Sequence, residues 1–321
     1  MPSLGFGVQL LARGAGDPAT SPFPSHKLLL EDGIRVEQLG FDAVWVPDHY
    51  YFERPWGIDT FPEVWTLLTA IAVKTEKIRL GSNVLSATFR HPGMLAKMAG
   101  ALQELADGRL IVGIGAGNQV NENTAFGHNF ERRIGAFKEY LPILTKLLAG
   151  ETVTSEGRYF QLRDASLRTV VPHVPVWVAS GGPQMFELTA RCAEGWNMAG
   201  GGTDPAATRE KYEGFAAACR AAGKNVNDFD VCKQTFVAIA PDEATKKRMT
   251  EELAVKNKVT PEELASRTIV ETPDRMAARM RELTAVGVTH HIFAVVASDE
   301  WPNHSDTFEL IAREVLPRVR A

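Results

Sequence analysis

Cysteine is scarce in this chain, and its spacing excludes two classes of protein. The 321 residues include three cysteines, Cys192, Cys219 and Cys232, and no two of them form a Cys-X-X-Cys pair. An odd number of scattered cysteines argues against a disulfide framework and against a structural zinc site. We therefore expect a reducing compartment, and the simplest prediction is a cytoplasmic protein.

Long apolar runs and basic clusters are also missing. No apolar run approaches the roughly 18 residues that a membrane-spanning helix requires. The amino-terminal segment MPSLGFGVQLLARG has no basic stretch before its apolar residues, unlike a secretory signal. The net charge is −4, with no basic stripe for a phosphate backbone. We expect neither a membrane nor a nucleic acid as a partner.

Several catalytic signatures are absent as well. The chain has no Gly-X-Ser-X-Gly, no His-X-X-X-His and no acidic cluster with the spacing of metal ligands. We therefore predict no metal site and no serine nucleophile. A barrel hydrolase or aldolase that works without a cofactor would need a metal or a catalytic lysine, and neither stands out in the sequence.

What the chain does contain is one repeated pattern: a short apolar run, a turn and then an amphipathic stretch. The composition is ordinary, with 45% hydrophobic and 23% charged residues. The runs predict eight strands at residues 4–11, 43–46, 78–84, 109–114, 176–179, 195–198, 229–239 and 290–296. The stretches between them predict helices at residues 25–39, 62–75, 92–105, 121–148, 184–193, 205–222, 243–285 and from 306 onward.

This alternation predicts the fold. Short, continuously apolar strands are typical of sheets covered on both faces, and strands that alternate with helices form parallel β-α-β units. Eight such units favour a closed barrel over an open doubly wound sheet, and no linker marks a second domain. We predict a single (β/α)₈ TIM barrel over residues 1–321. A small polar insert follows the fourth helical region, and Thr152–Leu162 with Gly157 at its turn predicts a hairpin.

In such barrels the chemistry lies on the loops that follow the strands. Asp48 and His49 directly follow the second predicted strand. A histidine titrates near neutral pH and can transfer a proton, while a neighbouring carboxylate can fix its tautomer. The alternative is a turn capped by the aspartate beside a solvated histidine. Position at the end of a strand supports the catalytic interpretation.

Two glycine-rich loops occupy equivalent positions. Gly113-Ile-Gly115-Ala-Gly117 lacks the Gly-X-Gly-X-X-Gly spacing, because residue 118 is Asn118. It indicates either close approach of backbone to a flat ligand or simply a tight loop. The run from Ser180 to Gln184 precedes a helix. Its N–H groups suit a phosphate, although an ordinary β-α loop with proline at the helix start would look similar.

Two further segments are candidates. Asn83 and Val84 fall where the third strand meets its loop, a place where an unusual backbone would serve function. The aromatic residues Tyr50, Phe52 and Trp56 follow His49. They indicate either the wall of a partly apolar substrate pocket or packing of a long loop on the barrel rim.

Five segments together carry a resemblance to a known family. They are EQLGFDAVWVPDH (37–49), IRLGSNV (78–84), RHP (90–92), GRLIVGIG (108–115) with Asn121 and Glu122, and VWVASGGPQM (176–185). In this order they resemble the bacterial luciferase-like superfamily of flavin- and deazaflavin-dependent oxidoreductases. The Asp-His pair and the Gly-Pro-Gln-Met run are most similar to the coenzyme F420-dependent branch.

The resemblance implies a deazaflavin across the barrel mouth. It implies a bulge with a non-proline cis peptide at Ser82-Asn83-Val84, Asp48 and His49 near the ring edge, and loops that hold the tail and its phosphate. The implied cofactor-binding residues are Asp48, His49, Ser82, Asn83, Val84, Gly115, Gly117, Asn118, Asn121, Glu122, Ser180, Gly181, Gly182, Pro183 and Gln184.

The implied reaction is hydride transfer between C5 of F420 and a small organic substrate, with His49 and Asp48 as the catalytic residues. Tyr50, Phe52 and Trp56 would line the substrate pocket. One alternative is an FMN-dependent monooxygenase of the same superfamily. Another is a non-catalytic flavin-binding protein. No basic clamp for a sugar phosphate can be matched. Resemblance alone suggests a homodimer.

Overall fold

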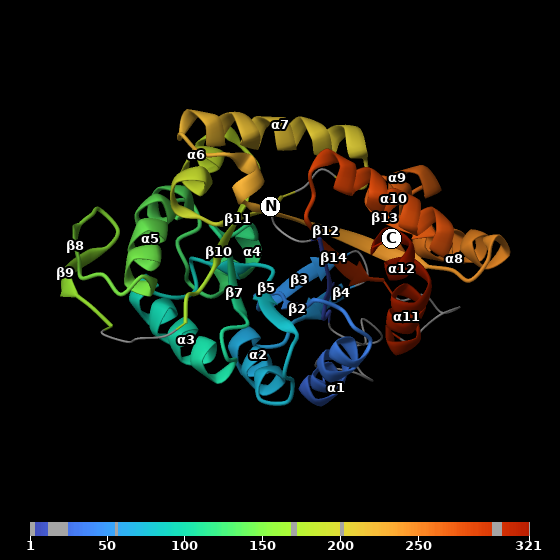
Figure 1. Cartoon of the computed structure of the whole chain (residues 1–321), viewed down its shortest axis with the longest axis horizontal. Coiled ribbons are helices and arrows are strands. Elements are labelled where there is room, and N and C mark those ends of the chain that lie inside the picture. The colour runs from blue at the N-terminus through green and yellow to red at the C-terminus, as the bar shows by residue number, and fades with distance from the viewer. Residues whose placement is uncertain are drawn as a thin grey trace.

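Eight parallel strands close into a barrel (Figure 1). The structure is a computed structural model, and it describes residues 4–11, 25–54, 57–167, 172–199, 202–296 and 304–320. The barrel closes because β10 pairs with β7 at one point and β14 pairs with β1 at another. Its strands are β1 (Gly5–Gln9), β2 (Ala43–Val46), β5 (Arg79–Ser82), β7 (Leu110–Gly115), β10 (Val176–Ser180), β11 (Gly195–Met198), β12 (Asp230–Ile239) and β14 (His290–Val295). The predicted TIM barrel is confirmed.

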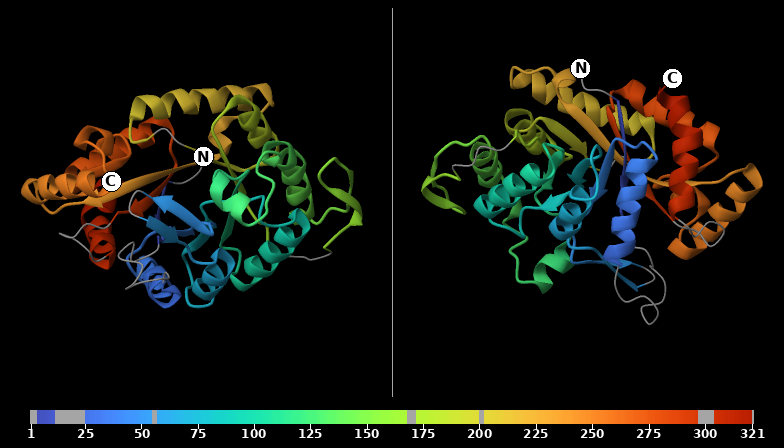
Figure 2. Two further views of the ribbon diagram at one scale, coloured as in Figure 1. Left: turned by 180° about the vertical axis from the view of Figure 1, so that it is seen from behind. Right: turned by 60° about the horizontal axis from the view of Figure 1, so that its bottom comes forward.

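Helices surround this barrel and cover the outer face of its sheet (Figures 1 and 2). The helices are α1 (His26–Gln38), α2 (Val64–Ala72), α3 (Pro92–Leu105), α4 (Val120–Ala125), α5 (Arg133–Leu148), α6 (Pro183–Cys192), α7 (Pro205–Ala221), α8 (Glu243–Asn257), α9 (Pro261–Ala265), α10 (Pro273–Val286), α11 (His304–Leu310) and α12 (Leu316–Arg320), with a short 3₁₀ helix, η1 (Val226–Asp228), and a π-helix, η2 (Ile311–Val315). Several begin with a proline, which suits a first turn where the missing N–H costs no helical bond.

Three regions differ from the sequence prediction. The single helix predicted at 121–148 is two helices, α4 and α5, because α4 ends before Gly127, whose φ is +75°. The helical region predicted at 243–285 contains a strand, β13 (Thr268–Glu271), which pairs with the far end of the long β12. An antiparallel hairpin of β3 (Tyr51–Arg54) and β4 (Gly57–Thr60) follows β2 and was not predicted. Strand β13 and the β3–β4 hairpin both lie outside the barrel, so the repeated pattern of strands and helices does not predict them.

The third strand of the barrel is interrupted by a bulge. Gly81 pairs with Ile111, whereas Leu85 in β6 (Leu85–Ser86) pairs with Ile114, so one extra residue stands on this strand. The peptide bond between Asn83 and Val84 is cis. A side chain at Gly113 would stand 2.0 Å from the carbonyl oxygen of Ser82, so glycine permits the close approach of the two strands. The bulge and the cis peptide implied by the resemblance are confirmed.

The predicted insert is also a hairpin, formed by β8 (Val153–Glu156) and β9 (Gln161–Ala165) beside α5. Glu139 on α5 holds its turn, because the carboxylate accepts hydrogen bonds from the backbone N–H groups of Arg158, Tyr159 and Phe160 at 2.9–3.1 Å. Hydrogen bonds from backbone N–H to a carboxylate are among the stronger ones. This contact fixes the hairpin, and with it the side chains of Tyr159 and Phe160, against the first half of α5.

The remaining exclusions concern cysteines and membranes. Cys219 and Cys232 are buried and all three cysteines are free, as expected for a chain without a disulfide framework. Within the described ranges, no helix has both the length and the apolar character needed to cross a membrane.

Candidate active site at the barrel mouth

The loops singled out in the sequence converge at one end of the barrel. Strands β2, β5, β7 and β10 are neighbours in the sheet and parallel. Their carboxyl ends therefore carry Asp48-His49, the bulge at Asn83-Val84, the loop from Gly115 to Asn118 and the loop from Ser180 to Gln184 side by side. The structure brings together all four predicted segments.

His49 is held in one orientation by Glu122. Its Nδ1 atom lies 2.8 Å from Glu122 Oε1, and the backbone N–H of Tyr50 donates to Glu122 Oε2 at 3.0 Å. Glu122 is 2% exposed and lies on α4. Because a carboxylate only accepts hydrogen bonds, it places the imidazole proton on Nδ1. The Nε2 atom is then the ring nitrogen left for a ligand, and Glu122 acts on the histidine.

Asp48 forms an ion pair with Arg90, a residue to which the sequence analysis gave no role. Arg90 donates to both of its carboxylate oxygens, at 2.6 and 3.1 Å, and Ser86 N–H donates at 3.1 Å. Arg90 also reaches Glu63 at 3.2 Å. The segment Arg90-His-Pro92 was part of the resemblance, but its spacing gives no pairing with Asp48. Asp48 anchors the loop after β2.

Electrostatics in this pair follow from burial. Burial raises the pKa of the Asp48 carboxyl above its ordinary value, and the Arg90 guanidinium opposes that shift. Burial by itself would lower the pKa of Arg90, but its bonds with Asp48 and its attraction to Glu63 raise it. The guanidinium therefore stays charged, and removing it would leave a buried carboxylate without its cation.

A chain of amides crosses the mouth between strands that are not neighbours. Asn83 Nδ2 donates to Gln9 Oε1 at 2.6 Å, and Asn197 Nδ2 donates to Asn83 Oδ1 at 2.5 Å. All three side chains are buried. Gln9 and Asn197 were missed, although each is the polar residue near the carboxyl end of an otherwise apolar predicted strand, which was a usable signal. Together they form a polar layer directly below the mouth.

The loop after β7 has mixed roles. Gly117 has a φ of +92°, a conformation that favours glycine, and Asn118 is exposed. Asn121 donates its amide to Glu53 on β3 at 2.7 Å, so it ties the β3–β4 hairpin to α4. Ser82, a predicted cofactor contact, bonds instead to the backbone of Gly113 through both its donor and its acceptor capacity.

The loop after β10 leaves a helix start uncapped. Gly182 is the N-cap of α6 without a side-chain cap, and an added Cβ there would meet no atom within 4 Å. Ser180 is buried and its hydroxyl accepts from Thr189 at 3.1 Å. Gln184 is exposed and accepts from Lys138. Backbone N–H groups at an open helix start are suited to an anion.

The aromatic residues divide into two groups. Phe52 and Phe61 pack on the imidazole of His49, with ring centroids 4.3 and 5.4 Å away. Tyr50 instead stacks on Phe126 at 3.9 Å, and its hydroxyl lies 3.2 Å from His128 Nε2. Phe52 is therefore placed beside the candidate base, whereas Tyr50 packs against Phe126 and His128, which follow α4. Trp56 lies outside the described residues.

Comparison with known proteins identifies a family and many similar proteins, three of which bear on this site. Residues 4–256 match the family described as luciferase-like monooxygenase. An F420-dependent glucose-6-phosphate dehydrogenase from Beutenbergia cavernae is 32% identical, over 91% of this chain and 93% of the relative. The fold is shared with an F420-dependent secondary alcohol dehydrogenase (TM-score 0.82, 20% identity, 99% and 100% coverage) and a monooxygenase from Streptomyces bottropensis (0.80, 23%, 98% and 99%).

Proposed function

The chain belongs to the luciferase-like monooxygenase family, and from this premise we propose that it is an F420-dependent oxidoreductase. It transfers a hydride between C5 of the deazaflavin and a carbon atom of a small organic substrate. The observation that carries the proposal is the His49–Glu122 pair at the mouth, beside the bulge and the open glycine loops. The F420-dependent relatives support the choice of cofactor.

The residues present fit such a cofactor. Val84 is half-buried above the bulge, which leaves a surface for one face of a flat ring. Open space at Gly182 and the uncapped start of α6 leave room for a phosphate. When bound, F420 supplies hydride chemistry at C5. The protein supplies binding, orientation and proton transfer.

His49 supplies the proton transfer in this proposal. With Nδ1 committed to Glu122, the neutral imidazole presents an unprotonated Nε2 that accepts a proton, and the imidazolium returns it from the same atom. Phe52 and Phe61 pack on the ring and hold it away from bulk water. Glu122 is a positioning residue, because it acts only through His49.

Asp48 and Arg90 are also positioning residues. Their bidentate ion pair fixes the start of the loop that carries His49, and it links that loop to the segment after β6. We assign Asp48 to this task. The substrate then lies against Phe52 and Phe61, which favours a molecule that is partly apolar. A homodimer remains a prediction of the resemblance.

The cofactor is tested by fluorescence quenching of F420 on titration with the purified protein. We expect saturable quenching at micromolar concentrations. An absence of saturation would contradict the cofactor assignment. Tight binding of FMN together with oxygen-dependent oxidation of a substrate would instead support the alternative, an FMN-dependent monooxygenase.

The role of His49 is tested by two variants. His49→Asn removes the proton acceptor, and we expect turnover to fall by about 10²–10⁴-fold while F420 still quenches saturably. Glu122→Gln keeps the shape but loses the carboxylate, so we expect a smaller fall and a changed pH profile of kcat/KM. Unchanged turnover in His49→Asn would exclude proton transfer by this residue. Wild-type protein that quenches F420 saturably but turns over no substrate would instead support a passive flavin-binding protein.

A further inference from the structure

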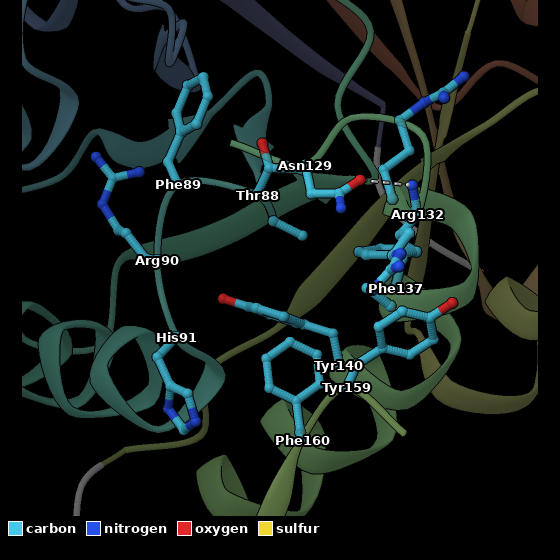
Figure 3. A pocket seen from close by; sticks show the side chains of 13 residues that line it. Thr88, Phe89, Arg90, His91, Asn129, Arg132, Phe137, Tyr140, Tyr159 and Phe160 are labelled. Carbon is cyan, nitrogen blue, oxygen red and sulfur yellow. Dashed lines mark hydrogen bonds between the residues drawn. The ribbon is translucent and has the colours of Figure 1, made fainter. Parts of the chain in front are cut away.

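A cavity of about 410 Å³ lies beside Arg90, and Arg90 is the one lining residue that has a role in the function proposed above. Its walls come from the segment between β6 and α3, the first turns of α5 and the β8–β9 hairpin (Figure 3). The volume is within the roughly 300–1,000 Å³ typical of small-molecule sites. The hairpin contributes Tyr159 and Phe160, which Glu139 holds in place.

This cavity lies on the opposite side of α5 from the loop proposed to hold the cofactor phosphate. Arg133, Phe137 and Tyr140 line the cavity. Lys138, on the same helix, instead bonds to Gln184 at 3.1 Å. At ~100° per helical residue, Lys138 points roughly 160° away from the middle of the cavity face. The helix therefore separates the cavity from the loop after β10.

The charge of the lining favours an anion. Arg132 and Arg133 stand at the start of α5, and none of the described residues that line the cavity is acidic. The helix start adds partial positive charge. Arg90, the third guanidinium in the wall, is neutralised by Asp48. Arg133 Nε is buried and has no hydrogen-bond partner in the described part of the chain.

Tyr140 supplies an independent observation. Its side chain is 1% exposed, and its hydroxyl has no partner within the described residues. Figure 3 shows the ring reaching across the cavity toward Arg90. Phe160 packs edge-to-face on it at 5.6 Å. A buried hydroxyl without a partner is costly, and burial raises the pKa of Tyr140, so this group is a protonated donor.

We propose that the cavity is a second ligand site, which binds a small aromatic carboxylate with a hydroxyl group at the far end of its ring system. The carboxylate meets Arg132 and Arg133. The rings lie among the aromatic side chains of α5 and the hairpin. The distal hydroxyl accepts a hydrogen bond from Tyr140. Nothing in this assignment depends on the cofactor.

Isothermal titration calorimetry with three matched compounds tests the site. 6-Hydroxy-2-naphthoate carries both groups, 2-naphthol lacks the carboxylate and 2-naphthoate lacks the hydroxyl. We expect 1:1 binding of 6-hydroxy-2-naphthoate and at least about tenfold weaker binding of 2-naphthol, because a charge-assisted hydrogen bond contributes about that factor. Absence of saturable binding, or equal affinity for 2-naphthol, would overturn the proposal.

Variants assign the contacts. The double variant Arg132→Gln/Arg133→Gln should weaken 6-hydroxy-2-naphthoate at least about tenfold and leave 2-naphthol unchanged. Tyr140→Phe should weaken 6-hydroxy-2-naphthoate but not 2-naphthoate. Lys146→Gln removes a cation from the far end of the same helix and should change neither. Unchanged affinity of the double variant for 6-hydroxy-2-naphthoate would refute the carboxylate contact with Arg132 and Arg133. Unchanged binding of 2-naphthol by the double variant, and of 2-naphthoate by Tyr140→Phe, shows that each variant is folded.

Saturating F420 separates this site from the cofactor site. We expect the affinity for 6-hydroxy-2-naphthoate to be the same with and without F420. Mutual exclusion would overturn the proposal, because the cavity would then belong to the cofactor. The test also runs on protein that fails to quench F420, so failure of the proposed function and failure of this site give different results.

Discussion

The barrel interior has two layers of opposite chemistry. The lower layer consists of Trp45, Trp177 and His290, whose rings contact one another across the barrel at centroid distances of 5.3–5.5 Å. The upper layer consists of Gln9, Asn83 and Asn197, joined by amide hydrogen bonds. Both layers are buried, yet only the upper layer adjoins His49 and the glycine loops.

This difference shows how one interior can serve two tasks. In the lower layer, rings from strands that are not neighbours fill space that glycines leave open. An added Cβ at Gly81, for example, would stand 2.2 Å from Trp45. Such packing stabilises the barrel through burial of apolar area. In the upper layer the amides fix side-chain orientation directly beneath the site. We therefore expect mutations in the lower layer to change stability and mutations in the upper layer to change binding.

The largest expected effect comes from Trp177→Ala in the lower layer. Trp177 is 1% exposed, so the substitution leaves a large cavity, and we expect the free energy of unfolding to fall by about 3–5 kcal/mol. Urea denaturation measures this. The Kd for F420, measured where the variant is folded, should change little. A large loss of F420 affinity without loss of stability would break the division between the layers.

The next effect is the loss of stability in acid, which for each histidine taken alone is smaller than the effect of Trp177→Ala. Burial lowers the pKa of both His290 and His291 to about 3, whereas the unfolded chain titrates near 6.5. Between these values the unfolded state binds more protons, so stability is lost as pH falls below about 6.5. The loss is about 1.4 kcal/mol per pH unit for each histidine.

Denaturation at pH 7, 6 and 5 measures this slope. His291→Gln and His290→Gln should each reduce the change of unfolding free energy with pH by about 1.4 kcal/mol per pH unit, the contribution of one histidine. Equal slopes in the wild type and both variants would mean that these histidines are not held neutral in the folded protein.

The smallest expected effect on stability is that of Asn197→Ala in the upper layer. It leaves Asn83 Oδ1 without its donor, so we expect a loss of about 1–2 kcal/mol. The affinity for F420 should fall about tenfold, which corresponds to about 1.4 kcal/mol, because Asn83 adjoins the bulge. Quenching titrations and urea denaturation on the same preparation compare the two losses. An unchanged Kd would show that the upper layer is purely structural.

Much of the fold was predictable from the sequence. The runs 43–46 and 195–198 match β2 and β11, because strands covered on both faces are continuously apolar. The prediction was wrong where a segment departs from the repeat. The strand Thr268–Glu271 pairs with an extension of β12 beyond the barrel, and no local sequence pattern predicts such an extension.

The position of the candidate site was predictable from the sequence, but the side chains that contact Asp48 and His49 were not. Asp48 and His49 stand at the end of β2, as expected. Their partners are 42 residues away in Arg90 and 73 residues away in Glu122. Sequence periodicity therefore gave the loops that form the mouth, since strand order and parallel direction follow from it. Only the tertiary structure decided which side chains meet, because contacts between distant residues depend on how strands and helices pack.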